Sequence, residues 1–216
     1  MNANAGVVAA TDMFVGNPFS TRHTRPGAIP PLDSAGRPVD VAALCAQLAF
    51  KGGSAAIVGA HGSGKTTLLE ALAREFERAG IPAGRVRLRA RRDAVQVLRA
   101  ILCSPAGAVV CVDSWERMVP VAAGLVRLVA RAVGCNLLVT THRPTALPTL
   151  VVCETTPRLL AAIVDRLPGL EQRGCEVIAD VDIEAAFRNH AGNIRESLYE
   201  LYDRFEDRTR RPPVRL

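Results

Sequence analysis

One short stretch, residues 59–66 with the sequence GAHGSGKT, constrains the fold more than any other part of this chain. It fits the pattern G-x-x-x-x-G-K-[ST], in which a glycine-rich turn presents backbone N–H groups to phosphate oxygens. The lysine of the pattern reaches the outer phosphates, and the final hydroxyl reaches a Mg²⁺ ion. Lysine occurs only at positions 51 and 65. Its presence at the motif position favours phosphate binding over a glycine-rich turn that has no ligand.

The residues on either side of this stretch have the patterns of a buried strand and an amphipathic helix. The apolar run 55–58 precedes it, and residues 67–79 follow with leucines and Phe76 on one helical face, before Gly80 and Pro82 end the helix. Strand, loop and helix therefore come in the order that the motif requires. We expect the phosphates of a nucleotide to contact Gly59, Ala60, His61, Gly62, Ser63, Gly64, Lys65, Thr66 and Thr67.

Composition and charge limit the compartment and the partners only broadly. Half of the positions are apolar, but no run approaches the roughly twenty apolar residues of a membrane span. The six cysteines show no C-x-x-C spacing and are typical of buried thiols in a reducing compartment, so we expect a cytoplasmic protein. The formal charge of +6 comes almost wholly from arginine. It leaves nucleic acid or an acidic protein open as a partner, and a homo-oligomer is open as well.

An acidic residue ends the apolar run 108–113, as in a Walker B segment. At the carboxyl end of a parallel strand, Asp113 would hold Mg²⁺ together with Thr66. Hydrolysis also needs a group that orients water, often a glutamate directly after this aspartate, but Ser114 occupies that place. Glu116 is the nearest carboxylate and is the candidate for that role, the alternative being a surface position in the turn.

Polar side chains also end the next predicted strand, residues 136–142. Because the carboxyl ends of parallel strands meet at one edge of a sheet, Thr140, Thr141 or His142 is expected to meet the outer phosphate or the attacking water. Ordinary strand-end capping is the alternative for all three.

The remaining segments predict an arm, a core and a lid. Residues 1–38 contain an aperiodic stretch rich in Pro, Gly and Arg, which predicts an extended arm outside the core, with Arg22, His23, Arg25 and Pro26 as candidate contacts to the base. Residues 39–154 alternate helices and strands, with an edge strand over 85–89 whose arginines face solvent. Residues 155–206 carry only helices, one of them with Asp182 as its cap and the last with Asn193 as its cap. Residues 207–216 form a basic tail that we expect to be disordered.

Four segments together resemble AAA+ ATPases and their STAND relatives: residues 59–66, 109–113, 137–142 and 192–196, followed by a helical tail. The resemblance implies a P-loop NTPase fold, with a three-layer α/β/α core, a mainly parallel five-stranded sheet and a small C-terminal helical lid. It places Thr140 or Thr141 as the first sensor and Arg195 as the second sensor, which reaches from the lid to the γ-phosphate. The absence of a glutamate directly after Asp113 departs from the family pattern.

The resemblance and the motifs lead to an ATP-binding, Mg²⁺-dependent NTPase in which the nucleotide sets the position of a lid or the binding of a partner. The candidate catalytic residues are Lys65, Asp113, Glu116, Thr141 and Arg195, and the candidate metal ligands are Thr66 and Asp113. Two alternatives remain open at this stage. One is a nucleotide-gated protein- or nucleic-acid-binding switch with little hydrolysis, which Ser114 favours, and the other is a P-loop kinase.

Overall fold

The computed structural model describes residues 16–50, 53–170 and 177–210. A five-stranded sheet lies at its centre, with the strand order β2-β3-β4-β1-β5. Every neighbouring pair of strands is parallel. The strands are β1 Ala55–Gly59, β2 Ala83–Arg87, β3 Val109–Asp113, β4 Asn136–Thr141 and β5 Thr149–Cys153. The expected α/β class and parallel five-stranded sheet are therefore confirmed.

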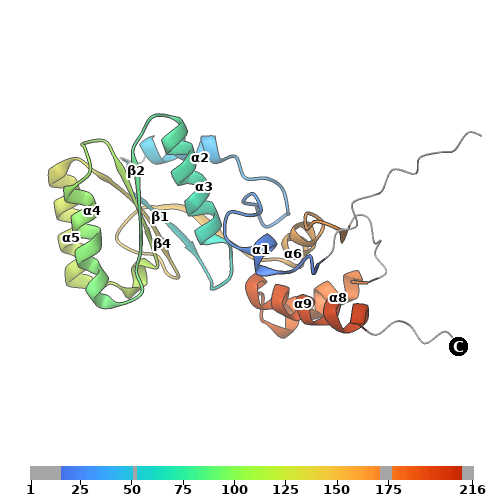
Figure 1. Ribbon diagram of the computed structural model, residues 1–216. Helices are drawn as coiled ribbons and strands as arrows, with labels where there is room; N and C mark the ends of the chain where they lie inside the picture. The colour runs from blue at the N-terminus through green and yellow to red at the C-terminus, as the bar shows by residue number, and fades with distance from the viewer. Residues whose placement is uncertain (1–15, 51–52, 171–176, 211–216) are drawn as a thin grey trace, which may run out of the picture.

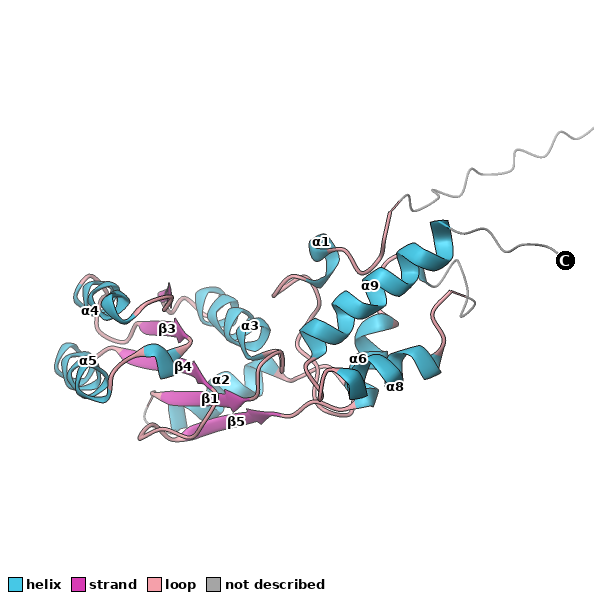
Figure 2. Cartoon of the chain, turned by 90° about the horizontal axis from the view of Figure 1, so that it is seen from below, coloured by secondary structure: helices cyan, strands magenta, loops and turns pink. Residues whose placement is uncertain are grey.

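Helices cover both faces of the sheet, which gives three layers (Figures 1 and 2). On one face lie α2 and α3, and on the other lie α4 and α5. Their bounds are α2 Val41–Phe50, α3 Lys65–Arg78, α4 Ala94–Leu102 and α5 Pro120–Val133. Short 3₁₀ turns, η1 Arg91–Asp93 and η2 Trp115–Arg117, precede α4 and α5. No helix in the described parts of the chain is long and apolar enough to cross a membrane.

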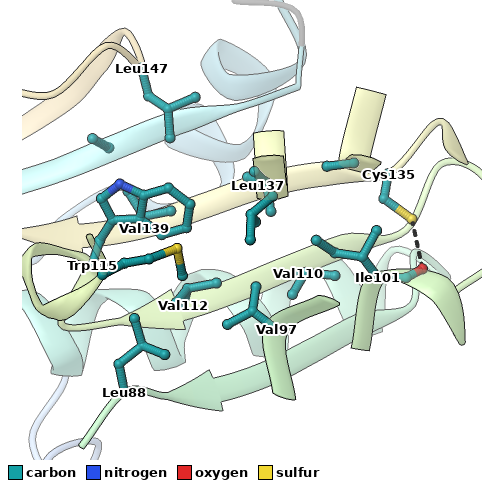
Figure 3. Close-up of a cluster of buried hydrophobic side chains, with 14 of the residues drawn as sticks. Leu88, Val97, Ile101, Val110, Val112, Trp115, Cys135, Leu137, Val139 and Leu147 are labelled. Atoms are coloured by element: carbon teal, nitrogen blue, oxygen red, sulfur yellow. Dashed lines mark hydrogen bonds between the residues drawn. The ribbon is translucent and has the colours of Figure 1, made fainter. Parts of the chain in front are cut away.

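The apolar strands bury alternate side chains in two separate cores, because successive residues of a strand point to opposite faces. Val110 and Val112 of β3 pack with α4 and α5, together with Trp115, Val139 and Leu147 (Figure 3). Val109 and Cys111 pack on the other face with α2 and α3. A strand that is buried on both faces has a continuous run of apolar residues in its sequence, so the positions of these strands can be predicted from the sequence.

Residues 142–148 connect β4 to β5 without a helix. These two strands flank β1, so the connection crosses the sheet in an extended form. Leu147 is buried against the α4 and α5 face of the sheet and anchors the crossing segment there. A parallel crossover usually contains a helix. Because this connection has none, the extended residues 143–147 lie beside α5 where a helix would otherwise pack.

A second group of helices lies beyond the carboxyl edge of the sheet: α6 Pro157–Val164, α8 Asp180–Asn189 and α9 Ile194–Arg210. They share a core around Leu160, Leu201 and Phe205. The hydroxyl of Thr156 caps α6 by accepting from Leu159 N at 3.0 Å. Asn193 Oδ1 accepts from Glu196 N at 3.4 Å, as expected for the cap of α9.

The arm differs from the extended segment outside the core that its composition predicts. It contains a short helix, α1 Thr21–Thr24, and Phe19 is buried among the lid helices, where its ring lies 6.1 Å from that of Phe205. The side-chain amide of Asn17 donates to Tyr202 O at 3.0 Å. The segment thus contributes to the helical core, because a single aromatic anchor needs no periodic pattern around it.

Two further expectations about the lid are corrected. Residues 207–210 are not a disordered tail but continue α9 to Arg210, where Arg208 pairs with Asp182; residues 211–216 lie outside the described chain. Asp182 is not the residue that precedes α8, because the helix begins at Asp180. Its carboxylate instead reaches back from the first turn and accepts from Ala179 N at 3.0 Å.

Candidate functional site

The loop 59–64 connects the buried strand β1 to α3 at the carboxyl edge of the sheet. Gly62 and Gly64 have φ values of 71° and 83°, a left-handed conformation that glycine adopts at little cost. Leu68 N donates to Gly64 O at 3.0 Å. The N–H groups of the first turn of α3, which begins at Lys65, precede this bond and have no carbonyl partner within their own helix. The loop and helix therefore present backbone donors at the positive end of the helix dipole.

The ammonium group of Lys65 folds back over this loop. Its Nζ donates to Gly59 O at 2.8 Å and to Ala60 O at 2.5 Å, and lies 3.3 Å from Nδ1 of His142. The residue is 8% exposed, and burial lowers the pKa of Lys65. A phosphate group at the loop would provide the counter-charge that two neutral carbonyls do not.

Asp113, at the end of β3, is the centre of a polar cluster. Thr66 Oγ1 donates to its Oδ1 at 3.2 Å, and Thr140 Oγ1 donates to the same oxygen at 2.6 Å. The guanidinium of Arg87, from the edge strand β2, lies 3.4 Å from Oδ2. Three parallel strands and the first turn of α3 thus bring a carboxylate and two hydroxyls together, a set of hard oxygen donors that suits Mg²⁺.

The neighbouring threonines of β4 have different surroundings. Thr140 also accepts from Ser114 N at 2.9 Å, so it ties the end of β4 to the turn after β3. Thr141 is buried on the other side, where its Oγ1 donates to Arg143 O at 3.0 Å. Of the two sensor candidates, the structure therefore brings Thr140 to Asp113 and leaves Thr141 apart from it.

The turn after Asp113 brings Glu116 back toward the phosphate loop. Ser114 has φ 68°, a left-handed conformation that is uncommon outside glycine, and the 3₁₀ turn η2 follows it. Glu116 Oε1 then lies 3.1 Å from Nε2 of His142. On the other side of the ring, Nδ1 of His142 lies 3.3 Å from Lys65 Nζ and 3.2 Å from Gly59 O. Glu116, His142 and Lys65 form one continuous chain of contacts.

His61, within the loop, stacks on this chain from outside. Its ring centroid lies 3.7 Å from that of His142. The pKa of His61 is lowered, first by the charge of His142 and then by burial and by Lys65. The neutral form of His61 is therefore favoured beside the cationic groups of the loop.

A cavity of about 260 Å³ opens beside the phosphate loop, between the core and the lid. Residues 62–68 form its floor, and the end of β5 forms one wall. The arm contributes Pro26 and residues 29–34, whereas Arg22, His23 and Arg25 are not part of the lining. From the predicted loop residues, Gly62, Ser63, Gly64, Lys65, Thr66 and Thr67 line the cavity, while Gly59, Ala60 and His61 lie outside its lining.

The lid meets the phosphate loop at the start of α9. Ile194 and Arg195 line the same cavity as Lys65 and Thr66. A Cβ atom built on Gly62 would lie 1.9 Å from Oδ1 of Asn193, so only glycine allows the cap of α9 to approach the loop this closely. Asn193 thus lies against the phosphate loop, which its capping pattern did not indicate.

Sequence reasoning missed the contact of Arg87 with Asp113 and the apolar residues of the arm. The alternating pattern of β2 indicated only a solvated face for Arg87. Register explains the contact, because Arg87 pairs with Asp113 at the last position of the β2 and β3 ladder. The proline and leucine residues at 30–32 lacked any periodic signal.

The parallel strand order, the glycine-rich loop between β1 and α3, and the helical group after β5 together define a P-loop NTPase fold. Comparison with solved structures finds the same fold in RuvB. The chain is similar to RuvB of Thermotoga maritima, a Holliday junction branch migration motor, with a TM-score of 0.50 and 18% identity over 77% of this chain. It is also similar to a mutant of that RuvB, with a TM-score of 0.51 and 16% identity, again over 77% of this chain.

This chain spans about three fifths of the length of those RuvB chains, 59% and 60%. The likeness establishes the fold. A scan against protein-family models and a search of curated proteins each gave no match.

Proposed function

We propose that this protein is an ATP-binding, Mg²⁺-dependent NTPase that couples its nucleotide state to the position of the helical lid. One observation carries the proposal: Lys65 and Thr66, in the first turn of α3, line a cavity that the lid residue Arg195 also lines, and Thr66 donates to Asp113. A nucleotide placed there contacts the core and the lid at once. Closing a lid over a ligand at such an interface is a common way of turning binding into movement.

The donor groups suit the parts of a Mg²⁺-nucleotide. The N–H groups of the loop and the ammonium of Lys65 bind anionic oxygens. Thr66 and Asp113 would hold the metal ion, directly or through water, and Thr140 orients the carboxylate of Asp113. Bound Mg²⁺ neutralises charge on the outer phosphates. The apolar wall formed by the arm, including Ile29 and Leu32, suits a base.

Hydrolysis requires a group that orients water toward the γ-phosphate. Glu116 is our candidate, because its turn and its contact with His142 bring its carboxylate to the loop side of the sheet edge. Arg195 would contact the γ-phosphate from the lid. In this scheme Thr141 acts indirectly, by fixing the backbone that positions His142.

A switch with slow turnover is the second candidate. It is favoured by Ser114 in the place of a water-orienting glutamate, and by the engagement of Glu116 with His142. Such a protein would use ATP to gate the binding of a protein or nucleic acid rather than to cycle rapidly. No feature of the described residues favours the phosphoryl acceptor site that the kinase alternative requires.

Two measurements on the full chain test this proposal. Titration with a fluorescent ATP analogue, with and without Mg²⁺, should show metal-dependent binding, and the absence of binding would refute the proposal. Steady-state phosphate release with and without duplex DNA, at several protein concentrations, then separates the candidates. Turnover supports the NTPase. Tight binding without turnover supports the switch, and stimulation by DNA or by self-association identifies the type of partner.

A further inference from the structure

Exposed apolar side chains gather on the outer side of α4 and α5, far from the nucleotide cavity. Val121 is 85% exposed, Val95 69%, Leu128 65%, Leu102 64% and Leu125 51%. The two helices lie side by side over the sheet in both views (Figures 1 and 2). These five residues, with the half-buried Leu98 between them, form what we call the α4–α5 strip.

Helix geometry makes the strip continuous. Val97 and Ile101 of α4 and Val126 and Ala130 of α5 are buried and fix the side of each helix that faces the sheet. On α5, the flank that carries Ala123 and Arg127 lines a cavity of about 380 Å³ with residues 143–147. The opposite flank therefore faces α4.

Leu125, with Val121 and Leu128 at helical spacing, lies on that opposite flank. The two helices are parallel, since each returns from the carboxyl edge of the same parallel sheet. The flank of α4 that faces α5 is consequently the one with Leu98, next to Val95 and Leu102. The apolar residues of the two helices thus line one seam.

Arginines flank this seam on both sides. Arg99 is exposed on α4, on the side of the strip away from α5. Arg127 and Arg131 are exposed on α5, on the side of the strip away from α4. Neither helix contains an aspartate or glutamate. Within the described part of the chain, none of the three arginines forms an ion pair. An apolar row between unpaired cations is complementary to an apolar row between carboxylates.

We propose that the α4–α5 strip binds an amphipathic helix of a partner protein, with leucine-like residues on one face and acidic residues along its flanks. A helix fits the seam between two parallel helices through side chains at i, i+3, i+4 and i+7. A second copy of the same strip would place arginine against arginine. Membrane-surface helices usually carry Trp or Phe on their apolar face, and the strip has only Val and Leu.

Fluorescence anisotropy with the full chain tests this inference. The probe is a labelled synthetic helix with leucines at i, i+3, i+4 and i+7 and glutamates on its flanks. Two comparison peptides replace its glutamates by lysines or scramble its order. The acidic peptide should bind at least about tenfold more tightly than either, and rising salt should weaken its binding.

Protein variants place the binding on the strip. Leu128→Asp and Arg131→Glu should each weaken binding of the acidic peptide by about tenfold or more, because both residues are exposed and neither change disturbs a buried contact. Val181→Asp is the matched control, since Val181 is an exposed apolar residue of α8, 70% accessible and outside the strip. It should leave the affinity unchanged.

Several outcomes would overturn the inference. Equal binding of the acidic, basic and scrambled peptides would show that the strip recognises neither the charge of the partner nor the spacing of its leucines. Binding that survives Leu128→Asp would place the peptide elsewhere. Vesicles of phosphatidylserine and phosphatidylcholine that bind the parent but not Leu128→Asp would identify a membrane surface as the occupant. Concentration-dependent dimerisation that Leu128→Asp abolishes would identify a second copy.

Discussion

Lys65 links the backbone of the phosphate loop to His142, and the residue is buried at the start of α3. We expect Lys65→Ala to weaken ATP binding by at least tenfold, because a charge-assisted contact contributes about 1.5–3 kcal/mol. Titration with a fluorescent ATP analogue measures this loss. Arg78→Ala, an exposed position in the last turn of the same helix, is the control and should bind normally. Unchanged affinity in a folded Lys65→Ala protein would contradict the phosphate-loop assignment.

Asp113 receives hydroxyl donors from Thr66 and Thr140, so its carboxylate is preorganised before any metal binds. Asp113→Asn keeps the shape and one acceptor but removes the charge. We expect it to raise the Mg²⁺ concentration needed for nucleotide binding by about tenfold or more, since Mg²⁺ prefers anionic oxygen ligands. Magnesium titrations at fixed nucleotide measure the shift, and thermal unfolding checks that the fold is intact. Identical magnesium dependence would assign Asp113 a role only in the turn.

Glu116 contacts His142, which also contacts Lys65. If Glu116 orients the attacking water, Glu116→Gln should reduce phosphate release by about 10²-fold or more while leaving ATP affinity nearly unchanged. His142→Ala should lower the rate less, because it removes the positioning partner and not the carboxylate. Glu184→Gln, an exposed change in α8, serves as the control. A rate that Glu116→Gln leaves unaltered would favour the slow switch.

At the residue scale, the loop and Asp113 were proposed because a motif and a strand end identify them, and Glu116 because it is the nearest carboxylate after that strand end. The sequence could not decide which of Thr140 and Thr141 faces the site, and the reason is physical. Both faces of β4 are buried, so its apolar run gives no alternation that would show which threonine faces the site. Arg87 was interpreted as solvated, because its contact depends on the register between β2 and β3.

Among the elements, α8 and α9 are joined by an ion-pair cluster around Asp182. Arg208 Nη1 lies 2.6 Å and Arg204 Nη1 2.7 Å from its carboxylate. The Arg208 hydrogen bonds, the Ala179 N–H and Arg204 lower the pKa of Asp182 to about 2. A lowered pKa in the folded state stabilises the fold above the unfolded pKa, near 4, and this stabilisation is lost as pH falls toward 2.

We therefore expect Asp182→Asn to lower the free energy of unfolding by about 1–2 kcal/mol at neutral pH, a figure reduced for the solvent screening of the half-exposed Arg208. The difference between parent and variant should shrink as pH falls from about 4 to about 2. Denaturant unfolding at several pH values measures it. A difference that is independent of pH in this range would show that Asp182 acts through its hydrogen bonds and not its charge.

Prediction succeeded for elements whose apolar residues recur with a clear helix or strand period. It failed where a single side chain, or a contact between residues far apart in the sequence, decides the structure. The strands β1, β3 and β4 and the helix α3 have apolar patterns that are set by the sheet, and their bounds differ from expectation by only a residue or two. The burial of Phe19 and the continuation of α9 past Asp207 depend on contacts between the arm, α8 and α9. No local pattern in the sequence carries that information.

On the scale of the whole molecule, the cavity beside the phosphate loop lies where the core meets the lid. Asn193 lies against Gly62, and the apolar residues Ile194, Leu198 and Leu201 hold α9 in the lid core. We therefore expect a shift of the phosphate loop to move the first turn of α9. The arm adds a second link, because Phe19 packs in the lid while residues 29–34 line the cavity.

Arg195 is the lid cation that we propose senses the nucleotide. It lies next to the buried Ile194 at the start of α9, is exposed, and lines the cavity together with Lys65. The dipole of its own helix is positive at this end and repels a cation. An anion outside the helix therefore explains its position better than the helix does, and the γ-phosphate is the anion that distinguishes ATP from ADP.

Arg195→Ala should consequently weaken ATP binding by about tenfold or more and ADP binding much less, because the lost charge-assisted contact, about 1.5–3 kcal/mol, belongs to the γ-phosphate. Parallel titrations with both nucleotides measure the difference. Arg188→Ala, an exposed arginine at the end of α8, controls for the loss of a lid charge and should affect neither nucleotide. Hydrogen exchange adds a structural readout: ATP should protect the first turn of α9 more than ADP does in the parent, and equally in Arg195→Ala. An equal loss of affinity for both nucleotides would assign Arg195 to the stability of the lid and not to sensing of the γ-phosphate.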